Sequence, residues 1–138
     1  YRRAIAEMWE GKPFDEKHTV DIMATSNRGF IEGFLRGNPG QAGHEYQSSN
    51  SEYSTHRYSG IIRAYDVNLK RMNVEVRNPI KVGGTYEICL PNANLTFIID
   101  GLFTDKGEAV LQIHGGVKSC WISYPNDPGP FALLREPI

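Results

Sequence analysis

The chain has 138 residues, of which 40% are hydrophobic and 22% are charged, a composition typical of one soluble globular domain with at most a small appendage. No apolar stretch approaches the roughly 20 residues that a membrane-spanning helix needs, and no secretory signal is visible. We therefore expect a cytoplasmic protein without a membrane partner. The net charge of −1 argues against nucleic-acid binding over the whole surface, although local basic patches can still attract phosphates.

Residues 1–35 are predicted to form a helical linker region with two short helices. In the first ten residues the apolar side chains recur at three-to-four spacing and share one face: Ala4, Ile5, Met8 and Trp9. Gly11 and Pro13 are expected to end this helix. Asp15 is the expected N-cap of a second helix, which should end near residues 26–27.

Residues 36–56 are predicted to form a polar loop, and the preceding residues 29–35 to be extended. The loop has almost no aliphatic side chains and is rich in Gly, Ser, Asn and Gln, so it cannot bury enough surface to offset its ordering entropy. Because a loop of about 20 residues is unusual inside a compact unit, we expect residues 36–55 to be the least ordered internal segment.

From residue 57 to residue 138 the hydrophobic period changes to two, which predicts a small β-domain. The alternation is strict over residues 72–76, and turn residues recur every few residues after it. The expected fold is mainly β with a small helical N-terminal region (α+β), its β part a six-stranded antiparallel barrel or sandwich resembling the barrel domains of translation factors. Strands are expected at 60–65, 72–76, 85–90, 95–103, 109–113 and 117–124, with a short final segment at 131–134. The expected core comprises Met72, Val74, Val76, Ile88 and Phe97.

The residue types that carry catalysis or bind metals lack the necessary spacing. The four histidines do not form an H-E-x-x-H zinc motif, and two cysteines are too few for an iron–sulfur cluster, so no metal or cofactor is expected. Cys89 and Cys120 are expected to be buried structural thiols, with a disulfide as the less favoured alternative. A protease dyad of Cys120 and His114 would lack an orienting third group.

Residues 61–88 resemble the C-terminal domain of the collagenase-like peptidases, the thirty-second family of unassigned type. The resemblance is carried by segments 60–62, 74–78, 83–84 and 87–88, and by the upstream run SNRGFIEGFLRG. The sequence departs from the family pattern at four positions where the family usually has His, Thr, Asp and Pro: Asn27, Glu32, Gly84 and Gly115. These departures affect a binding surface more than the barrel.

The resemblance implies a parent enzyme whose catalytic domain lies upstream, and this chain as its non-catalytic C-terminal accessory domain. The family includes collagen-degrading peptidases, which are hydrolases, and proteins needed for hydroxylation of tRNA or rRNA, some with iron–sulfur clusters. The first hypothesis is therefore substrate recognition or docking, with the parent acting in tRNA hydroxylation. The alternatives are a structural, interdomain or dimerisation clamp and a protein-binding module of a true peptidase. The implied partners are the upstream domain, tRNA or a protein substrate.

Two sets of side chains are candidates for these contacts. The expected RNA- or substrate-binding residues are Arg57, Arg63, Lys70, Arg71, Arg77 and Lys81, although the favoured simpler interpretation is that Arg63, Lys70 and Arg71 only solvate an exterior face of the barrel. The expected interdomain docking residues, which could also drive self-association, are Met8, Trp9 and Phe14. Arg77 is expected either to lie over an aromatic ring such as Tyr86 or to pair with Glu75, and Asn78 to fix the turn before Pro79.

Overall fold

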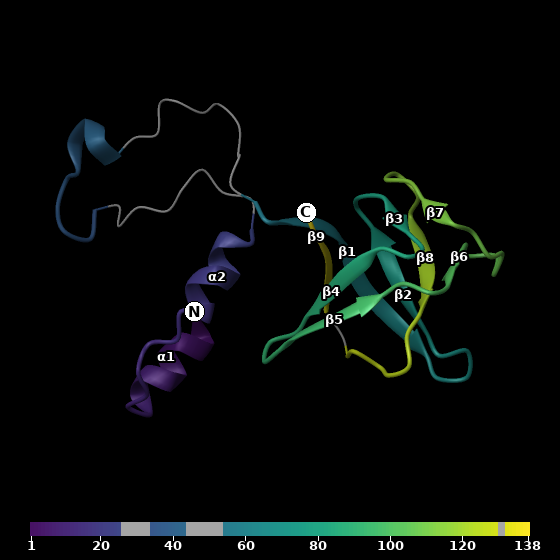
Figure 1. The fold of residues 1–138 in the computed structure, drawn as a ribbon, viewed down its shortest axis with the longest axis horizontal. Coiled ribbons are helices and arrows are strands. Elements are labelled where there is room, and N and C mark those ends of the chain that lie inside the picture. The colour runs from purple at the N-terminus through teal and green to yellow at the C-terminus, as the bar shows by residue number, and fades with distance from the viewer. Residues whose placement is uncertain (26–33, 44–53, 130–131) are drawn as a thin grey trace. The chain divides into compact units, whose positions relative to one another are not determined.

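The computed structural model describes residues 1–25, 34–43, 54–129 and 132–138, which fall into two compact units (Figure 1). The helical unit comprises residues 1–56 with Ile138, and the β unit comprises residues 57–137. The predicted extended segment 29–35 lies largely outside the described residues, as do residues 44–53 of the polar loop and the departures at Asn27 and Glu32. The described part of the loop, residues 36–43 and 54–56, includes a 3₁₀ helix and the first residue of a strand.

The first predicted helix is present as α1, which spans Arg2–Trp9. It ends in a Schellman motif, because Gly11 has a φ of 73°, its N–H donates to the Met8 carbonyl, and the Lys12 N–H donates to the Glu7 carbonyl, both at 3.0 Å. Gly11 therefore ends the helix as expected.

The second predicted helix is α2, which spans Lys17–Met23, and a short 3₁₀ helix follows at Gly40–Gly43. Asp15 lies one residue before the N-cap position, and its Oδ1 accepts a hydrogen bond from the Lys17 N–H at 3.0 Å. The predicted N-cap is therefore wrong by one residue, because Glu16 occupies that position, but the Asp15 carboxylate still satisfies one of the free N–H groups at the start of α2.

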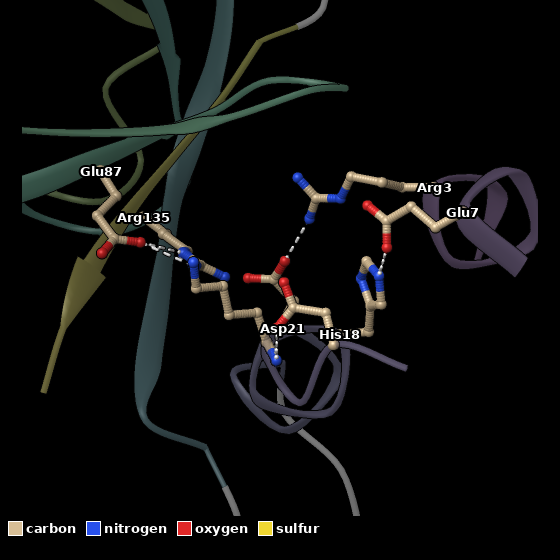
Figure 2. Close-up of polar contacts among 8 residues, drawn as sticks. Arg3, Glu7, His18, Asp21, Glu87 and Arg135 are labelled. Carbon is tan, nitrogen blue, oxygen red and sulfur yellow. Dashed lines mark hydrogen bonds and ion pairs between the residues drawn. The ribbon is translucent and has the colours of Figure 1, made fainter. Parts of the chain in front are cut away.

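Two polar contacts join α1 to α2 (Figure 2). Arg3 Nη2 lies 2.7 Å from Asp21 Oδ2, and His18 Nε2 lies 2.6 Å from Glu7 Oε2.

Within the described residues, no helix has the length and apolar character needed to cross a membrane.

The β unit contains nine strands among the described residues. A seven-stranded sheet has the order β5-β4-β9-β1-β2-β8-β6, and β3 and β7 form a separate pair. Figure 1 shows that the sheet is curled. The strands are β1 His56–Asp66, β2 Arg71–Val76, β3 Ile80–Lys81, β4 Thr85–Cys89, β5 Asn94–Ile98, β6 Leu102–Phe103, β7 Gln112–Ile113, β8 Ser119–Ser123 and β9 Leu133–Pro137.

The expectation of a mainly β chain with two helices is confirmed, but the expected number of six strands is wrong. The predicted strand at 95–103 is interrupted, because the backbone changes its pairing partner. The Ile99 N–H still donates to the Gly84 carbonyl next to β4, whereas the Gly101 carbonyl accepts a hydrogen bond from the Ser123 N–H of β8. A Cβ atom at Gly101 would collide with Ser123 Oγ. The continuous apolar pattern therefore covers two strands, β5 and β6.

The core lies on the concave side of the curled sheet and is built from alternate strand residues. Of the five expected core residues, Met72, Val74, Val76 and Ile88 are buried. Phe97 is only partly buried, and its ring meets the edge of the Tyr124 ring at a centroid distance of 5.0 Å. The buried cluster comprises Ile62, Met72, Val74, Val76, Ile80, Tyr86, Ile88, Ile99, Leu102, Ile113, Cys120, Ile122, Ala132 and Leu134.

Candidate nucleic-acid interface

The six basic residues singled out from the sequence lie in separate environments. Arg57 and Lys81 both pair with Glu136, the first by a hydrogen-bonded ion pair and the second at 3.9 Å. Glu136 is only 8% exposed, and a carboxylate so far from water needs a cationic partner. Arg57 and Lys81 therefore stabilise the β unit by neutralising the Glu136 carboxylate.

Arg63 and Arg77 meet at Glu75 on the outer side of the sheet. Arg63 donates to Glu75 Oε2 through Nε at 2.8 Å and Nη2 at 2.7 Å, and Arg77 pairs with Glu75 Oε1. The pairing of β1 with β2 shifts between Ile62 and Ala64, so that Arg63 is the extra residue of a β-bulge. Such bulges re-aim a side chain and often lie next to functional sites.

The Glu75 carboxylate lies in a strongly positive environment. The hydrogen bond from Arg63 is the largest influence that lowers the pKa of Glu75, and the charges of Arg63, Arg77 and Lys118 lower it further, while burial opposes them. Glu75 therefore stays ionised at neutral pH and orients the two guanidinium groups, which remain about half exposed.

A cavity of about 640 Å³ opens beside this cluster. Besides Arg63, Glu75 and Arg77, its lining includes a further cation and two neutral polar side chains: Lys118, Ser119 and Asn73. The Ser119 hydroxyl contacts both carboxylate oxygens of Asp105, at 2.7 and 2.8 Å. The lining therefore combines cations, which suit phosphate, with amide and hydroxyl groups, which suit polar ligand edges.

The remaining two basic residues lie at the other end of β2. The Arg71 guanidinium carbon lies over the Phe103 ring, 3.3 Å from its centroid. Lys70 precedes it in the β1–β2 turn with a φ of 49°, and its carbonyl accepts a hydrogen bond from the Tyr124 N–H. The structure thus brings Arg63 and Arg77 together, and it leaves Arg57, Lys81 and Lys70 in other surroundings.

Arg77 and Asn78 each make a specific contact within the β unit. Arg77 pairs with Glu75, one of its two expected partners, whereas Tyr86 is fully buried and its hydroxyl accepts a hydrogen bond from the Lys81 N–H. Asn78 Nδ2 donates to the Tyr58 carbonyl at 2.6 Å, so this contact connects the end of β2 to β1 across 20 residues and not to the local turn that was expected.

Sequence reasoning missed Lys118, Ser119, Asn73 and Trp121. Asn73 pairs with Trp121 across β2 and β8, and Glu75 pairs with Ser119, so these side chains share one face. The period of two in β8 indicates that Ser119 and Trp121 point the same way. Only the register between the two strands, however, places them beside the arginines.

The protease dyad considered from the sequence receives little support from the geometry. Both cysteines lie in the described part of the chain, and no disulfide joins them. Cys120 is fully buried, and burial raises the pKa of its thiol to about 12, while His114 is exposed. Within the described ranges, no group of three or more His, Cys, Asp or Glu side chains is arranged to hold a metal ion.

The expected docking residues are exposed in the helical unit. Trp9 is 81% exposed, Phe14 65% and Met8 64%. Met8 and Phe14 line a small, mainly apolar depression of about 290 Å³ together with Ile5 and Pro13. The helical unit therefore presents apolar side chains to its surroundings, and this arrangement is typical of interaction surfaces.

The β unit is similar to a known family of domains. Residues 54–135 match the family model described as the peptidase family U32 C-terminal domain. The chain belongs to peptidase family U32. The resemblance seen in the sequence is thereby confirmed.

Two relatives align with most of this chain. It is 30% identical over 129 residues to tRNA hydroxylation protein P of Escherichia coli K12, a match that covers 92% of this chain and 28% of that protein. It is 28% identical over 137 residues to tRNA hydroxylation protein P of Haemophilus influenzae Rd, covering 99% and 30%. The chain thus spans less than a third of the length of these relatives.

A solved U32 structure has the same fold. The crystal structure of the C-terminal domain of a U32 peptidase of Geobacillus thermoleovorans superposes with a TM-score of 0.54 at 18% identity, covering 59% of this chain and 92% of that one. One departure from the family pattern has a structural counterpart. A Cβ atom at Gly84 would lie 2.7 Å from Cε2 of the buried Tyr86, so the tyrosine ring excludes a side chain at this position.

Proposed function

We propose that the β unit is a non-catalytic accessory domain that binds tRNA for an upstream catalytic domain of the same U32 protein. The names of the E. coli and H. influenzae relatives support a parent that acts in tRNA hydroxylation, and the family assignment supports a C-terminal position in that parent. A fold alone does not specify a function, so the proposal depends on the surface of the β unit.

The observation that carries the proposal is the cationic cavity on the outer side of β2. Its lining holds three cations, Arg63, Arg77 and Lys118, against one carboxylate, Glu75. The lining itself thus has an excess of two positive charges (three minus one), and the excess is one when the adjacent Asp105 carboxylate, which Ser119 contacts, is included, in a chain whose overall net charge is −1. A local excess of this kind attracts a polyanion even when the whole protein does not.

The proposal narrows the set of basic residues expected to contact RNA. Arg63, Arg77 and Arg71 stay in the set, and Lys118 joins it. Arg57 and Lys81 neutralise the buried carboxylate of Glu136, and we propose no more than a long-range electrostatic contribution from them. Lys70 lies at the edge of this surface, in the β1–β2 turn.

The test is tRNA binding measured over a salt series. Because each phosphate contact releases about one counterion, replacing Arg77 and Lys118 together by alanine should weaken binding and lower the slope of log affinity against log salt by about two. The matched control replaces Arg2 and Lys17 of the helical unit by alanine, which removes the same charge elsewhere. Equal effects of the two double variants would contradict the proposal.

A second candidate function is an interdomain or dimerisation clamp, and the exposed apolar side chains of the helical unit favour it. We propose that Met8, Trp9 and Phe14 dock on the upstream domain, since each buried aromatic or Met side chain contributes about 1.5–3 kcal/mol. Light scattering of the chain, with and without Trp9→Ser, tests whether this surface associates. If the chain is monomeric and Trp9→Ser does not change its binding to the upstream domain, the docking proposal fails.

A further inference from the structure

The outer face of β2, β8 and β6 carries a row of partly exposed aromatic and amide side chains next to the cationic cavity. Arg71, Asn73 and Glu75 alternate along β2 with Met72 and Val74, which are fully buried. The alternation therefore separates a core face from an outer face. The same alternation in β8 buries Cys120 and Ile122 and leaves Trp121 partly exposed on the outer face.

Strand register brings these outer side chains next to one another. Asn73 pairs with Trp121 across β2 and β8, and Trp121 pairs with Phe103 across β8 and β6. Directly opposed residues of antiparallel strands have neighbouring side chains on one face. Asn73, Trp121 and Phe103 therefore form a continuous row across three strands, and Asn73 also lines the cationic cavity.

The Arg71 guanidinium is held over this row. Its central carbon lies 3.3 Å from the centroid of the Phe103 ring, well within the range of about 6 Å for a cation–π contact. The Phe103 ring also lies close to the backbone at Gly101, since a Cβ atom added there would be 3.1 Å from Phe103 Cε2. Arg71 is only partly buried, so its guanidinium remains in part accessible while it contacts the ring.

This combination fits unpaired RNA better than a duplex. Bases that are not paired expose their faces for stacking on aromatic rings or on arginine planes, and expose their edges to amide groups such as that of Asn73. A duplex offers an interacting protein mainly phosphates and 2′-hydroxyl groups. The cations of the cavity alone would suit either form, but the row beside them suits only an unstacked strand.

We infer that the outer face of β2, β8 and β6 binds an unpaired segment of RNA. Bases stack on Arg71 and Trp121, Asn73 contacts a base edge, and Arg63, Arg77 and Lys118 hold the phosphates. The inference rests on the proposed RNA-binding function and adds the class of RNA and the residues that distinguish it.

The test uses Trp121 as its own reporter. The chain has two tryptophans, so the Trp9→Phe variant leaves Trp121 as the single one. The probes are a short oligouridylate and an RNA duplex of the same length. We expect the oligouridylate to bind more tightly and to quench the Trp121 fluorescence, because a stacked base lies against the indole ring.

A conservative substitution separates stacking from charge. Arg71→Lys keeps the charge but loses the planar group, so it should weaken oligouridylate binding about five- to tenfold and leave the salt slope unchanged. Phe103→Leu, which removes the support of the guanidinium, should have a similar effect. The matched control is Arg2→Lys in the helical unit, which should change neither quantity.

The outcomes distinguish this inference from the function on which it rests. Equal affinity for the two probes, with unchanged Trp121 fluorescence and no effect of Arg71→Lys, would overturn the inference while leaving RNA binding in place. Failure of both probes and of tRNA to bind at low salt would overturn the proposed function as well.

Discussion

Glu87 of β4 and Arg135 of β9 lie directly opposite each other in the strand ladder, and two nitrogens of Arg135 donate to the same oxygen of Glu87 (Figure 2). The distances to Glu87 Oε2 are 2.8 Å from Nε and 2.7 Å from Nη2. The side chains are only 18% and 14% exposed, so this ion pair is shielded from water far more than the pair of Arg63 with Glu75.

Replacing Arg135 by alanine should therefore destabilise the β unit. The variant leaves a largely shielded carboxylate without two charge-assisted hydrogen bonds, and the expected loss is about 2 kcal/mol in the free energy of unfolding, measured by urea denaturation. The matched control is Arg63→Ala, which removes a more exposed ion pair and should cost less than about 1 kcal/mol. Equal losses of unfolding free energy in the two variants would show that shielding from water does not increase the contribution of the Glu87–Arg135 pair to stability.

Gly60→Ala should also destabilise the β unit, because β1 and β2 approach each other closely at this residue. An added Cβ atom would collide with the Glu75 carbonyl oxygen and lie 2.7 Å from Val74 Cγ1, and crowding of this kind costs about 1–3 kcal/mol. Gly115→Ala is the matched control, since its Cβ would meet nothing closer than 3.4 Å. If both variants unfold at the same urea concentration, the close approach is not required.

The sequence predicted the elements whose period extends over several residues. The three-to-four spacing and Gly11 predicted α1 and its end, and the alternation in β2 predicted both the strand and its buried face. The strands β3 and β7 have only two residues each, too few to show a period. The interruption between β5 and β6 depends on the approach of Gly101 to Ser123, a contact between distant segments that no local pattern contains.

The candidate site could be predicted only in part for a similar reason. Arg63 and Arg77 were identified from a local excess of basic residues, and the structure places both at Glu75. Lys118 joins them because β2 pairs with β8, and the register of that pairing is set by the packing of the core. The same tertiary packing pairs Arg57 with Glu136 and so separates it from the cluster.

The Glu75 cluster should make stability depend on pH in the acid range. Arg63 above all, with Arg77 and Lys118, holds the pKa of Glu75 below its ordinary value of 4.5. A lowered pKa in the folded state means that the ionised carboxylate stabilises the fold at any pH above its ordinary pKa. This stabilisation is lost as the pH falls from the ordinary value through the lowered one.

Urea unfolding of the wild type and of Glu75→Gln, followed from neutral pH to about pH 3, measures this effect. The difference in stability between the two proteins should be constant near neutral pH and should shrink in the acid window. Glu108→Gln, at an exposed position in a turn, is the matched control. If the difference in stability between the wild type and Glu75→Gln stays the same down to the lowest pH, the ionised Glu75 carboxylate does not stabilise the fold as expected.

Cys120 should be unreactive in the folded chain although it lies in the strand that carries Ser119 and Trp121. Burial is the main cause that raises the pKa of its thiol to about 12, and the charge of Asp105 adds to it. At pH 7 only about one thiol in 10⁵ would then be ionised, and the thiolate is the reactive form. Burial also blocks the approach of a reagent, so Cys120 is suited to packing and not to nucleophilic attack.

Labelling with a thiol-specific disulfide reagent tests this expectation, because Cys89 is only partly buried and provides an internal comparison. In the native wild type we expect one cysteine to react promptly and the second only after unfolding in urea. In Cys89→Ser the prompt reaction should disappear, whereas in Cys120→Ser it should remain.

We also expect no peptide cleavage by the chain, either with or without these substitutions, because a protonated, buried thiol cannot act as the nucleophile. Prompt labelling of Cys120 in the folded Cys89→Ser variant, or casein cleavage that depends on Cys120, would require a reactive thiol in β8 and would contradict the accessory role.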